Sequence, residues 1–167
     1  MHYRLYPVDP SSTESGQAWD YVSDQVMGGQ SQGQILQQQE KSGGWVTCLQ
    51  GEVSLENNGG FIQMQFDLSA IKDISQFDGF YVTWRGLAPA VAAHLKTSEL
   101  RQPWQSYKNN LFPALDWKND YWTFSQFAPY RTGIPLNLER LTRFGLLAIG
   151  QAGGVNLCVR ELGLFKR

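Results

Sequence analysis

G-E-V-S-L-E-N-N-G-G-F, at residues 51–61, holds a strand, a tight reversal and the start of a second strand. Val53 and Leu55 alternate with polar side chains, which is the period-two pattern of a strand with one buried face. Residues 61–66 resume the alternation beyond the reversal. The stretch therefore predicts a β-hairpin. Its turn falls on four residues that tolerate positive φ, namely Asn57, Asn58, Gly59 and Gly60.

The rest of the chain also reads as β-structure. Residues 80–85 and 91–96 each alternate between apolar and polar side chains, and residues 144–149 and 155–164 form the last strands. Residues 10–16 are predicted to form a loop. With no long amphipathic helix and no fixed repeat, we expect a single domain over residues 1–167 with an all-β, antiparallel β-sandwich fold.

Composition limits the function classes. The 167 residues carry a net charge of −1 and no Lys/Arg stripe, so we expect no nucleic-acid partner. No apolar run reaches the roughly 18 residues of a membrane span, and the first residues lack a signal peptide. We therefore expect a cytoplasmic protein that needs no cofactor. Cys48 and Cys158 lie in apolar runs, where we expect free thiols that pack as small hydrophobic groups.

One face of the predicted sheet is a candidate site. We expect the strands at 80–85 and 91–96 to pair with one another, so that their apolar side chains share the core and their polar ones share the opposite face. That face is either an ordinary solvated surface or a groove for a sugar, an anionic metabolite or a partner segment. Its candidate residues are Tyr81, Arg85, His94 and Lys96, with Trp104 and Tyr107 from the next strand.

Two loops resemble the complex I intermediate-associated protein 30 family. They are V-S-D-Q-V-M-G-G-Q-S-Q-G at residues 22–33 and the 51–61 stretch, and F-D-G-F at 77–80 and F-A-P-Y-R-T-G at 127–133 follow in order. The family-like region covers residues 19–167. Residues 86–89 read G-L-A-P where the family pattern would place an acidic turn.

The resemblance implies a galactose-binding-domain-like jelly roll, similar in shape to carbohydrate-binding modules. It also implies a non-enzymatic role in assembling respiratory complex I (NADH:ubiquinone oxidoreductase). The expected partners are then subunits or assembly intermediates of that complex, and the chain looks like a stand-alone bacterial member. The alternative is a module that binds a carbohydrate or another small ligand through the Arg85/His94 face.

The two loops themselves have two interpretations. Asp24 and Ser31 either present polar groups to a ligand, or Asp24 accepts hydrogen bonds from N–H groups of the loop while Val26 and Met27 plug the end of the core. We favour the second. The loop residues assigned a structural role are Asp24, Met27, Gly28, Gly29, Ser31, Asn57, Asn58, Gly59 and Gly60.

Catalysis has little support in the sequence. His2 and His94 are the two histidines, which excludes a His-rich metal site, and no C-x-x-C spacing occurs. Asp24, Glu52 or Glu56 could in principle serve a two-carboxylate glycosidase, but their spacing does not place any two in one cleft. We expect neither a bound metal nor an enzymatic activity.

Overall fold

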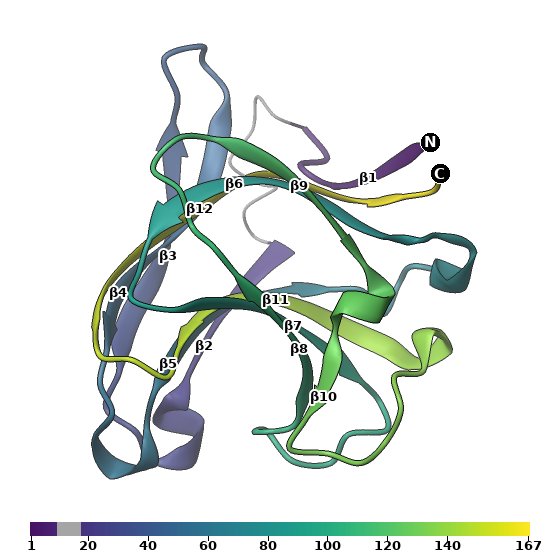
Figure 1. The fold of residues 1–167 in the computed structure, drawn as a ribbon. Helices are drawn as coiled ribbons and strands as arrows, with labels where there is room; N and C mark the ends of the chain where they lie inside the picture. Colours follow the sequence, from purple (N-terminus) through teal and green to yellow (C-terminus); the bar gives the residue numbers. More distant parts are fainter. Residues whose placement is uncertain (10–17) are drawn as a thin grey trace.

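The alternating side chains build two antiparallel sheets that pack face to face in the computed structural model, which describes residues 1–9 and 18–167 (Figure 1). Each sheet has six strands. Sheet A contains β1 (His2–Tyr6), β3 (Gln32–Gln39), β4 (Trp45–Val53), β6 (Gly79–Leu87), β9 (Lys118–Thr123) and β12 (Gly153–Phe165). Sheet B contains β2 (Trp19–Ser23), β5 (Phe61–Asp67), β7 (Val91–Thr97), β8 (Ser106–Leu111), β10 (Ala128–Tyr130) and β11 (Leu141–Ile149).

The long strand β12 organises sheet A. The strand order is β3-β4-β12-β6-β9, and β1 pairs with the second half of β12 beyond the end of β4. The two chain ends therefore lie side by side, and the Lys166 N–H donates to the Met1 carbonyl at 2.9 Å (Figure 1). Sheet B runs β10-β8-β7-β11-β5-β2, with β11 and β7 at its centre.

Short 3-10 turns connect several strands. They are η2 (Asp24–Met27), η3 (Glu56–Asn58), η4 (Ile74–Gln76), η5 (Phe124–Gln126) and η6 (Leu138–Arg140). Asn137 caps η6 by accepting a hydrogen bond from the Glu139 N–H at 3.1 Å. No helix within residues 1–9 and 18–167 has the length and apolar content needed to cross a bilayer.

The core lies between the inner faces of the two sheets. Phe80 and Trp84 of β6 face Phe144 of β11, and all three are fully buried. The Trp122 ring stacks on Phe144 with 6.3 Å between the ring centres. This arrangement confirms the predicted antiparallel β-sandwich, and it leaves the outer face of each sheet to carry polar side chains.

Two predicted strand pairings are wrong. Residues 51–66 do not form a hairpin, because β4 belongs to sheet A and β5 to sheet B. Strands β6 and β7 are divided between the sheets in the same way. Alternation shows which side chains of a strand are buried, but both inner faces of a sandwich bury their side chains, so alternation does not identify the neighbouring strand.

The prediction of two free thiols is also wrong. Cys48 of β4 and Cys158 of β12 lie directly opposite one another and form a disulfide, with 4.0 Å between their Cα atoms. The bond lies on the outer face of sheet A, where Val46 and Trp117 pack around it. The loop predicted at residues 10–16 lies outside the described residues.

Candidate functional site

The outer face of sheet B contains a pocket with a volume of about 140 Å³, here called the His94 pocket. Strand β7 contributes His94 and Lys96, because the intervening Leu95 points into the core. Strands β5 and β8 contribute Gln63 and Ser106. The remaining wall comes from Trp104, Tyr130, Arg131 and the apolar residues Met27, Phe61, Leu147 and Ile149.

Three buried polar side chains of the pocket lack partners. Gln63, His94 and Ser106 are 3%, 6% and 1% exposed. Gln63 Oε1, His94 Nε2 and Ser106 Oγ make no hydrogen bond in the described part of the chain. Because a buried polar atom without a partner costs about 1–3 kcal/mol, three such atoms at one pocket indicate positions that a bound molecule would satisfy.

Gly145 makes room for one of these groups. It lies on β11 directly beside Gln65 of β5 and His94 of β7. A Cβ atom at Gly145 would come within 1.9 Å of Gln63 Oε1. The missing side chain therefore allows the Gln63 amide to lie over the sheet, toward His94.

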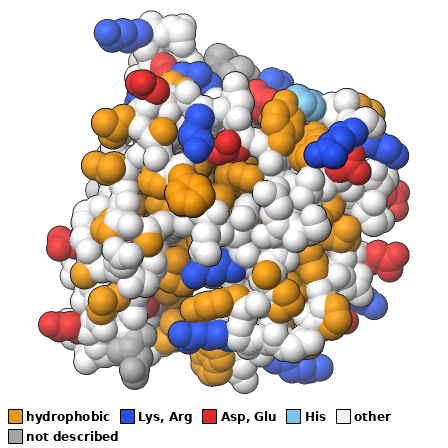
Figure 2. Space-filling view, in the orientation of Figure 1, with side chains coloured by type: hydrophobic (Ala, Val, Ile, Leu, Met, Phe, Trp, Pro, Cys, Tyr) orange, Lys and Arg blue, Asp and Glu red, His pale blue; other side chains and the backbone are white. Residues whose placement is uncertain are grey.

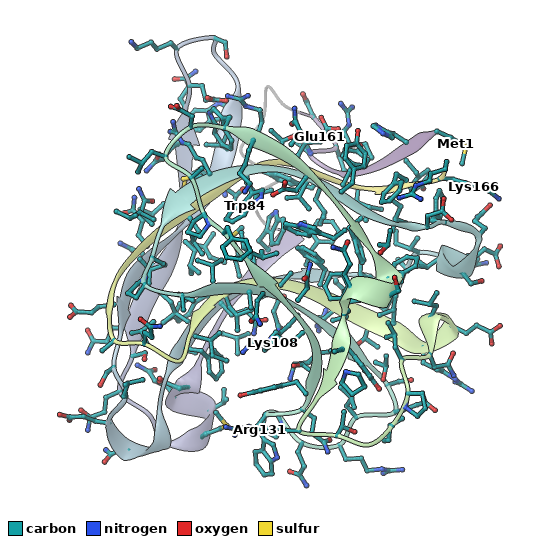
Figure 3. The ribbon with its side chains drawn as sticks, viewed as in Figure 1. Met1, Trp84, Lys108, Arg131, Glu161 and Lys166 are labelled. Atoms are coloured by element: carbon teal, nitrogen blue, oxygen red, sulfur yellow. A yellow bond between two sulfur atoms is a disulfide. The ribbon has the colours of Figure 1, made fainter. Side chains whose placement is uncertain are left out.

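Positive charge surrounds the pocket. Lys96 Nζ donates to the Pro103 carbonyl at 2.7 Å. Lys108 lies opposite His94 across β7 and β8, and its Nζ is 4.7 Å from the centre of the Tyr130 ring. The Arg131 guanidinium is 5.2 Å from the same ring centre. Figure 3 shows Lys108 and Arg131 on the same side of the molecule, and Figure 2 shows Lys and Arg side chains among hydrophobic ones in the lower centre of this face.

These surroundings keep the histidine neutral. Burial, with smaller contributions from the charges of Lys108 and Lys96, lowers the pKa of His94 to about 3. Burial also lowers the pKa of Lys96. At neutral pH the His94 ring therefore offers one N–H donor and one nitrogen acceptor rather than a charge.

The two family-like loops meet at one wall of the pocket. Asp24 is fully buried, and its carboxylate accepts hydrogen bonds from the Ser31 N–H at 3.0 Å, the Gly60 N–H at 2.5 Å and the Phe61 N–H at 3.2 Å. The Ser31 hydroxyl also donates to Asp24 and receives the Ser54 N–H at 2.8 Å. This carboxylate joins the turn after β2 to the chain that enters β5.

Glycines next to Asp24 are required by the same contacts. A Cβ atom at Gly29 would lie 2.5 Å from Asp24 Cγ, and one at Gly59 would lie 2.6 Å from Asp24 Oδ2. Gly28 ends η2 with φ of 86°, and Asn57 has φ of 54°.

The predicted core plug is only partly correct. Val26 is exposed, so the prediction that it closes the end of the core is wrong. Met27 is half-buried and packs on the outer face of sheet B with Phe61 and Leu147 rather than in the main core.

The structure divides the six candidate residues of the predicted face. His94, Lys96 and Trp104 come together in the pocket, and Trp104 is 43% exposed at its mouth. Tyr81 and Arg85 lie on the outer face of sheet A, so they do not share a face with His94. Tyr107 is fully buried in the core, where its hydroxyl donates to the Ile134 carbonyl at 2.9 Å.

Among the pocket residues that sequence reasoning missed, four polar or aromatic ones matter for binding. Gln63 alternates with Ile62 and Met64 of the core, so its place on an outer face could have been read from the pattern. The resemblance included the 127–133 segment, yet no role followed from it. The four residues are Gln63, Ser106, Tyr130 and Arg131.

Each of the two candidate residues on sheet A, Tyr81 and Arg85, lies against a neighbouring ring. The Arg85 and Arg160 guanidinium groups lie 4.7 Å and 4.1 Å from the centre of the Trp117 ring. Glu40 accepts two hydrogen bonds from Arg160, at 2.9 and 2.8 Å, and one from Trp117 Nε1 at 3.1 Å. Tyr81 stacks on His2 with 4.3 Å between ring centres.

Solved structures share the fold. The family 11 carbohydrate-binding module of a cellulosomal cellulase of Clostridium thermocellum superposes with a TM-score of 0.76 at 13% identity, over 100% of this chain and 95% of that one. A family 11 carbohydrate-binding module from Clostridium thermocellum in complex with a β-1,3-1,4-mixed-linked tetrasaccharide gives a TM-score of 0.69 at 13% identity, with 89% of each chain covered. An exo-β-agarase gives 0.59 at 8% identity, over 99% of this chain and 25% of that one. At these identities the likeness concerns the fold alone.

The family assignment comes from a sequence model. No match was found among curated proteins. The model described as "Complex I intermediate-associated protein 30" matches residues 8–159, which include both loops joined by Asp24 and all of the strands that line the pocket. The chain therefore belongs to the complex I intermediate-associated protein 30 family.

Proposed function

We propose that the protein is a non-catalytic binding module and that its His94 pocket holds one ring of a carbohydrate. The observation that carries the proposal is the set of unpartnered, buried polar atoms on Gln63, His94 and Ser106. Sugar hydroxyl groups both donate and accept hydrogen bonds, so a single ring can satisfy an amide oxygen, an imidazole and a hydroxyl together.

The aromatic residues of the pocket fit the same ligand. Trp104 stands half exposed at the mouth, and Tyr130 lines the wall beside His94, with 5.9 Å between the two ring centres. Aromatic faces provide apolar contact for the C–H side of a sugar ring. A cavity of about 140 Å³ suits one ring rather than a longer chain. The likeness to a module solved with a bound tetrasaccharide supports this choice.

Glycoside hydrolysis does not fit the pocket. Such hydrolysis usually needs two carboxyl groups that flank the bond to be cleaved. The lining residues include neither Asp nor Glu. Of the three carboxylates that the sequence suggested, Asp24 accepts hydrogen bonds from N–H groups of the two loops, and Glu52 and Glu56 are exposed.

Calorimetric titration of monosaccharides and short oligosaccharides tests the proposal. At least one sugar should bind. The single variants Trp104→Ala and His94→Ala should each weaken the affinity for that sugar about tenfold or more. Trp117→Ala is the matched control, since this tryptophan lies on sheet A and should leave binding unchanged. No heat from any sugar in a broad panel would remove the proposal.

We also propose a second role, that of a partner in assembly of respiratory complex I, because the chain belongs to a family named for that complex. Exposed apolar side chains give a protein partner something to contact. Leu87, at the end of β6, is 62% exposed, and Leu115 is 72% exposed. The Gly86 N–H donates a hydrogen bond to the Ala114 carbonyl at 2.8 Å, which ties the loop of Leu115 to β6.

Isolation of the tagged protein from its host tests this second role. Subunits or assembly intermediates of complex I should be recovered with it, and Leu115→Ser should reduce the yield. Deletion of the gene should lower NADH oxidation by membranes. Unchanged NADH oxidation in the deletion strain would count against an assembly role and would leave sugar binding untouched.

A further inference from the structure

The pocket has an unbalanced charge. Lys96 and Arg131 line it, and Lys108 lies beside it against Tyr130, whereas its lining has no acidic residue. The ion pairs among the described residues involve Lys118, Arg143 and Arg160, so none of the three pocket cations has a carboxylate partner there. Three positive charges around one small cavity attract a negative group.

The partial burial of Lys96 strengthens this preference. Its amino group has a neutral acceptor, the Pro103 carbonyl, at 2.7 Å. Burial lowers the pKa of Lys96, and the pocket lining contains no carboxylate that could offset the lost hydration. A bound anion would supply that charge in a place where solvent screening is weaker than at an open surface.

The unpartnered polar atoms of the pocket place a second requirement on the ligand, in addition to negative charge. Gln63 Oε1 is an acceptor, so an anionic group alone cannot satisfy it. Ser106 Oγ and the neutral His94 ring can each donate or accept. A ligand that fits all of these groups carries both hydroxyl donors and a negative charge.

We propose, on the basis of the sugar-binding function above, that the ligand of the His94 pocket is an acidic sugar. Its hydroxyl groups bind Gln63, His94 and Ser106, and its negative group lies toward Lys96 and Arg131. A carboxylate on a uronic acid and a phosphate on a sugar phosphate share this chemistry, and the experiment separates them.

The test is calorimetric titration of the intact chain with glucuronate, galacturonate, glucose 6-phosphate, glucose and acetate at low and high salt. At least one acidic sugar should bind about tenfold more tightly than glucose, because one charge-assisted hydrogen bond is worth about that factor. High salt should reduce this difference in affinity between the acidic sugar and glucose, because it screens the charges. Preference for a uronic acid or for glucose 6-phosphate identifies the carboxylate or the phosphate as the negative group.

A charge-removing variant shows where the preference arises. Arg131→Gln should weaken the acidic sugar about tenfold and change glucose less than about twofold. Arg140→Gln is the matched control, because Arg140 is an exposed residue of η6 outside the pocket and its replacement should change neither affinity. Far-UV circular dichroism of both variants checks that the fold is retained.

The remaining outcomes overturn the inference in distinguishable ways. Glucose binding as tightly as the acidic sugars, with Arg131→Gln silent, rejects the charge preference and leaves sugar binding in place. Acetate binding as tightly as glucuronate rejects the need for hydroxyl groups. Absence of binding by every probe rejects both the inference and the sugar-binding function.

Discussion

The outer faces of the two sheets carry similar cationic and aromatic side chains, but within the described chain these groups have a carboxylate partner around Trp117 on sheet A and none around the His94 pocket on sheet B. On sheet A, Glu40 neutralises Arg160 and accepts from Trp117, and Arg85 covers the same ring. On sheet B, Lys96 and Arg131 have no carboxylate partner in the described chain, and three buried polar atoms of the His94 pocket are unpaired. A mixture of cations and aromatics is therefore not itself a sign of a site. The informative feature is whether these groups already satisfy one another.

The largest effect should come from the disulfide of sheet A. Reduction of the Cys48–Cys158 bond should lower the free energy of unfolding by about 4 kcal/mol, because the bond closes a loop with a sequence separation of 110 residues. Urea unfolding with and without a reductant measures the difference. Affinity for the acidic sugar, for which glucuronate stands in this and the following predictions, should not change when it is measured at urea concentrations where the protein is folded, because the bond lies on the outer face opposite the pocket.

The double variant Cys48→Ala/Cys158→Ala is the control for the reductant. It should unfold at the same urea concentration whether or not the reductant is present. A reductant that weakens glucuronate binding while leaving stability unchanged would show that the two outer faces are coupled, which would break the comparison.

The disulfide also illustrates what could be predicted from sequence. The prediction of a last strand at residues 155–164 was correct, and the Gly- and Asn-rich residues of the 22–33 and 51–61 stretches correctly indicated turns, although the second turn connects the two sheets instead of closing a hairpin. The pairing of Cys48 with Cys158 depends on strand register across more than a hundred residues. Local patterns carry no information about that register, and the inferred compartment argued for free thiols.

The candidate site was predicted in part for the same reason. His94, Lys96 and Trp104 are close in sequence, so a local argument could group them. Tyr81 and Arg85 were added through a strand pairing that does not exist. Gln63 lies on β5 and Arg131 directly follows β10, and only the order of the strands in sheet B brings them to His94.

Two glycines sharpen the comparison between the faces. Gly163 on sheet A lies under Tyr81, and a Cβ atom there would be 2.3 Å from the ring and 2.6 Å from the Tyr3 carbonyl oxygen. Gly163→Ala should therefore lower the free energy of unfolding by about 3 kcal/mol, since neither a stacked ring nor backbone can move easily. It should leave glucuronate affinity unchanged.

Gly145→Ala on sheet B is the matched substitution. Its Cβ atom would collide with the end of the flexible Gln63 side chain, which can swing away. Stability should change by less than about 1 kcal/mol, while glucuronate affinity should fall about tenfold because an acceptor is displaced from the pocket. Urea unfolding and calorimetry give both quantities. The reverse pattern, with Gly163→Ala affecting binding and Gly145→Ala affecting stability, would contradict the assignment of roles to the two faces.

A smaller effect should follow from the buried histidine of the pocket. The pKa of His94 is about 3 in the folded protein and about 6.5 when the chain is unfolded. The unfolded state therefore takes up the proton first as pH falls, and folding stability should decrease between pH 6.5 and pH 3. From pH 7 to pH 5 the expected loss is about 2 kcal/mol. Burial is the main cause of the low pKa of His94, and the positive charges of Lys108 and Lys96 add to it.

His94→Gln isolates this contribution, because glutamine cannot take up a proton. The variant should lose clearly less stability than the wild type between pH 7 and pH 5 in urea unfolding. Glu40 and Asp67 do not interfere in this range, since hydrogen bonds to Arg160 and Ser69, respectively, lower the pKa of each carboxyl group, and their stabilisation is lost only below about pH 4.5. Equal pH dependence in the two proteins would mean that His94 is already solvated, and the pocket would then resemble the satisfied surface of sheet A.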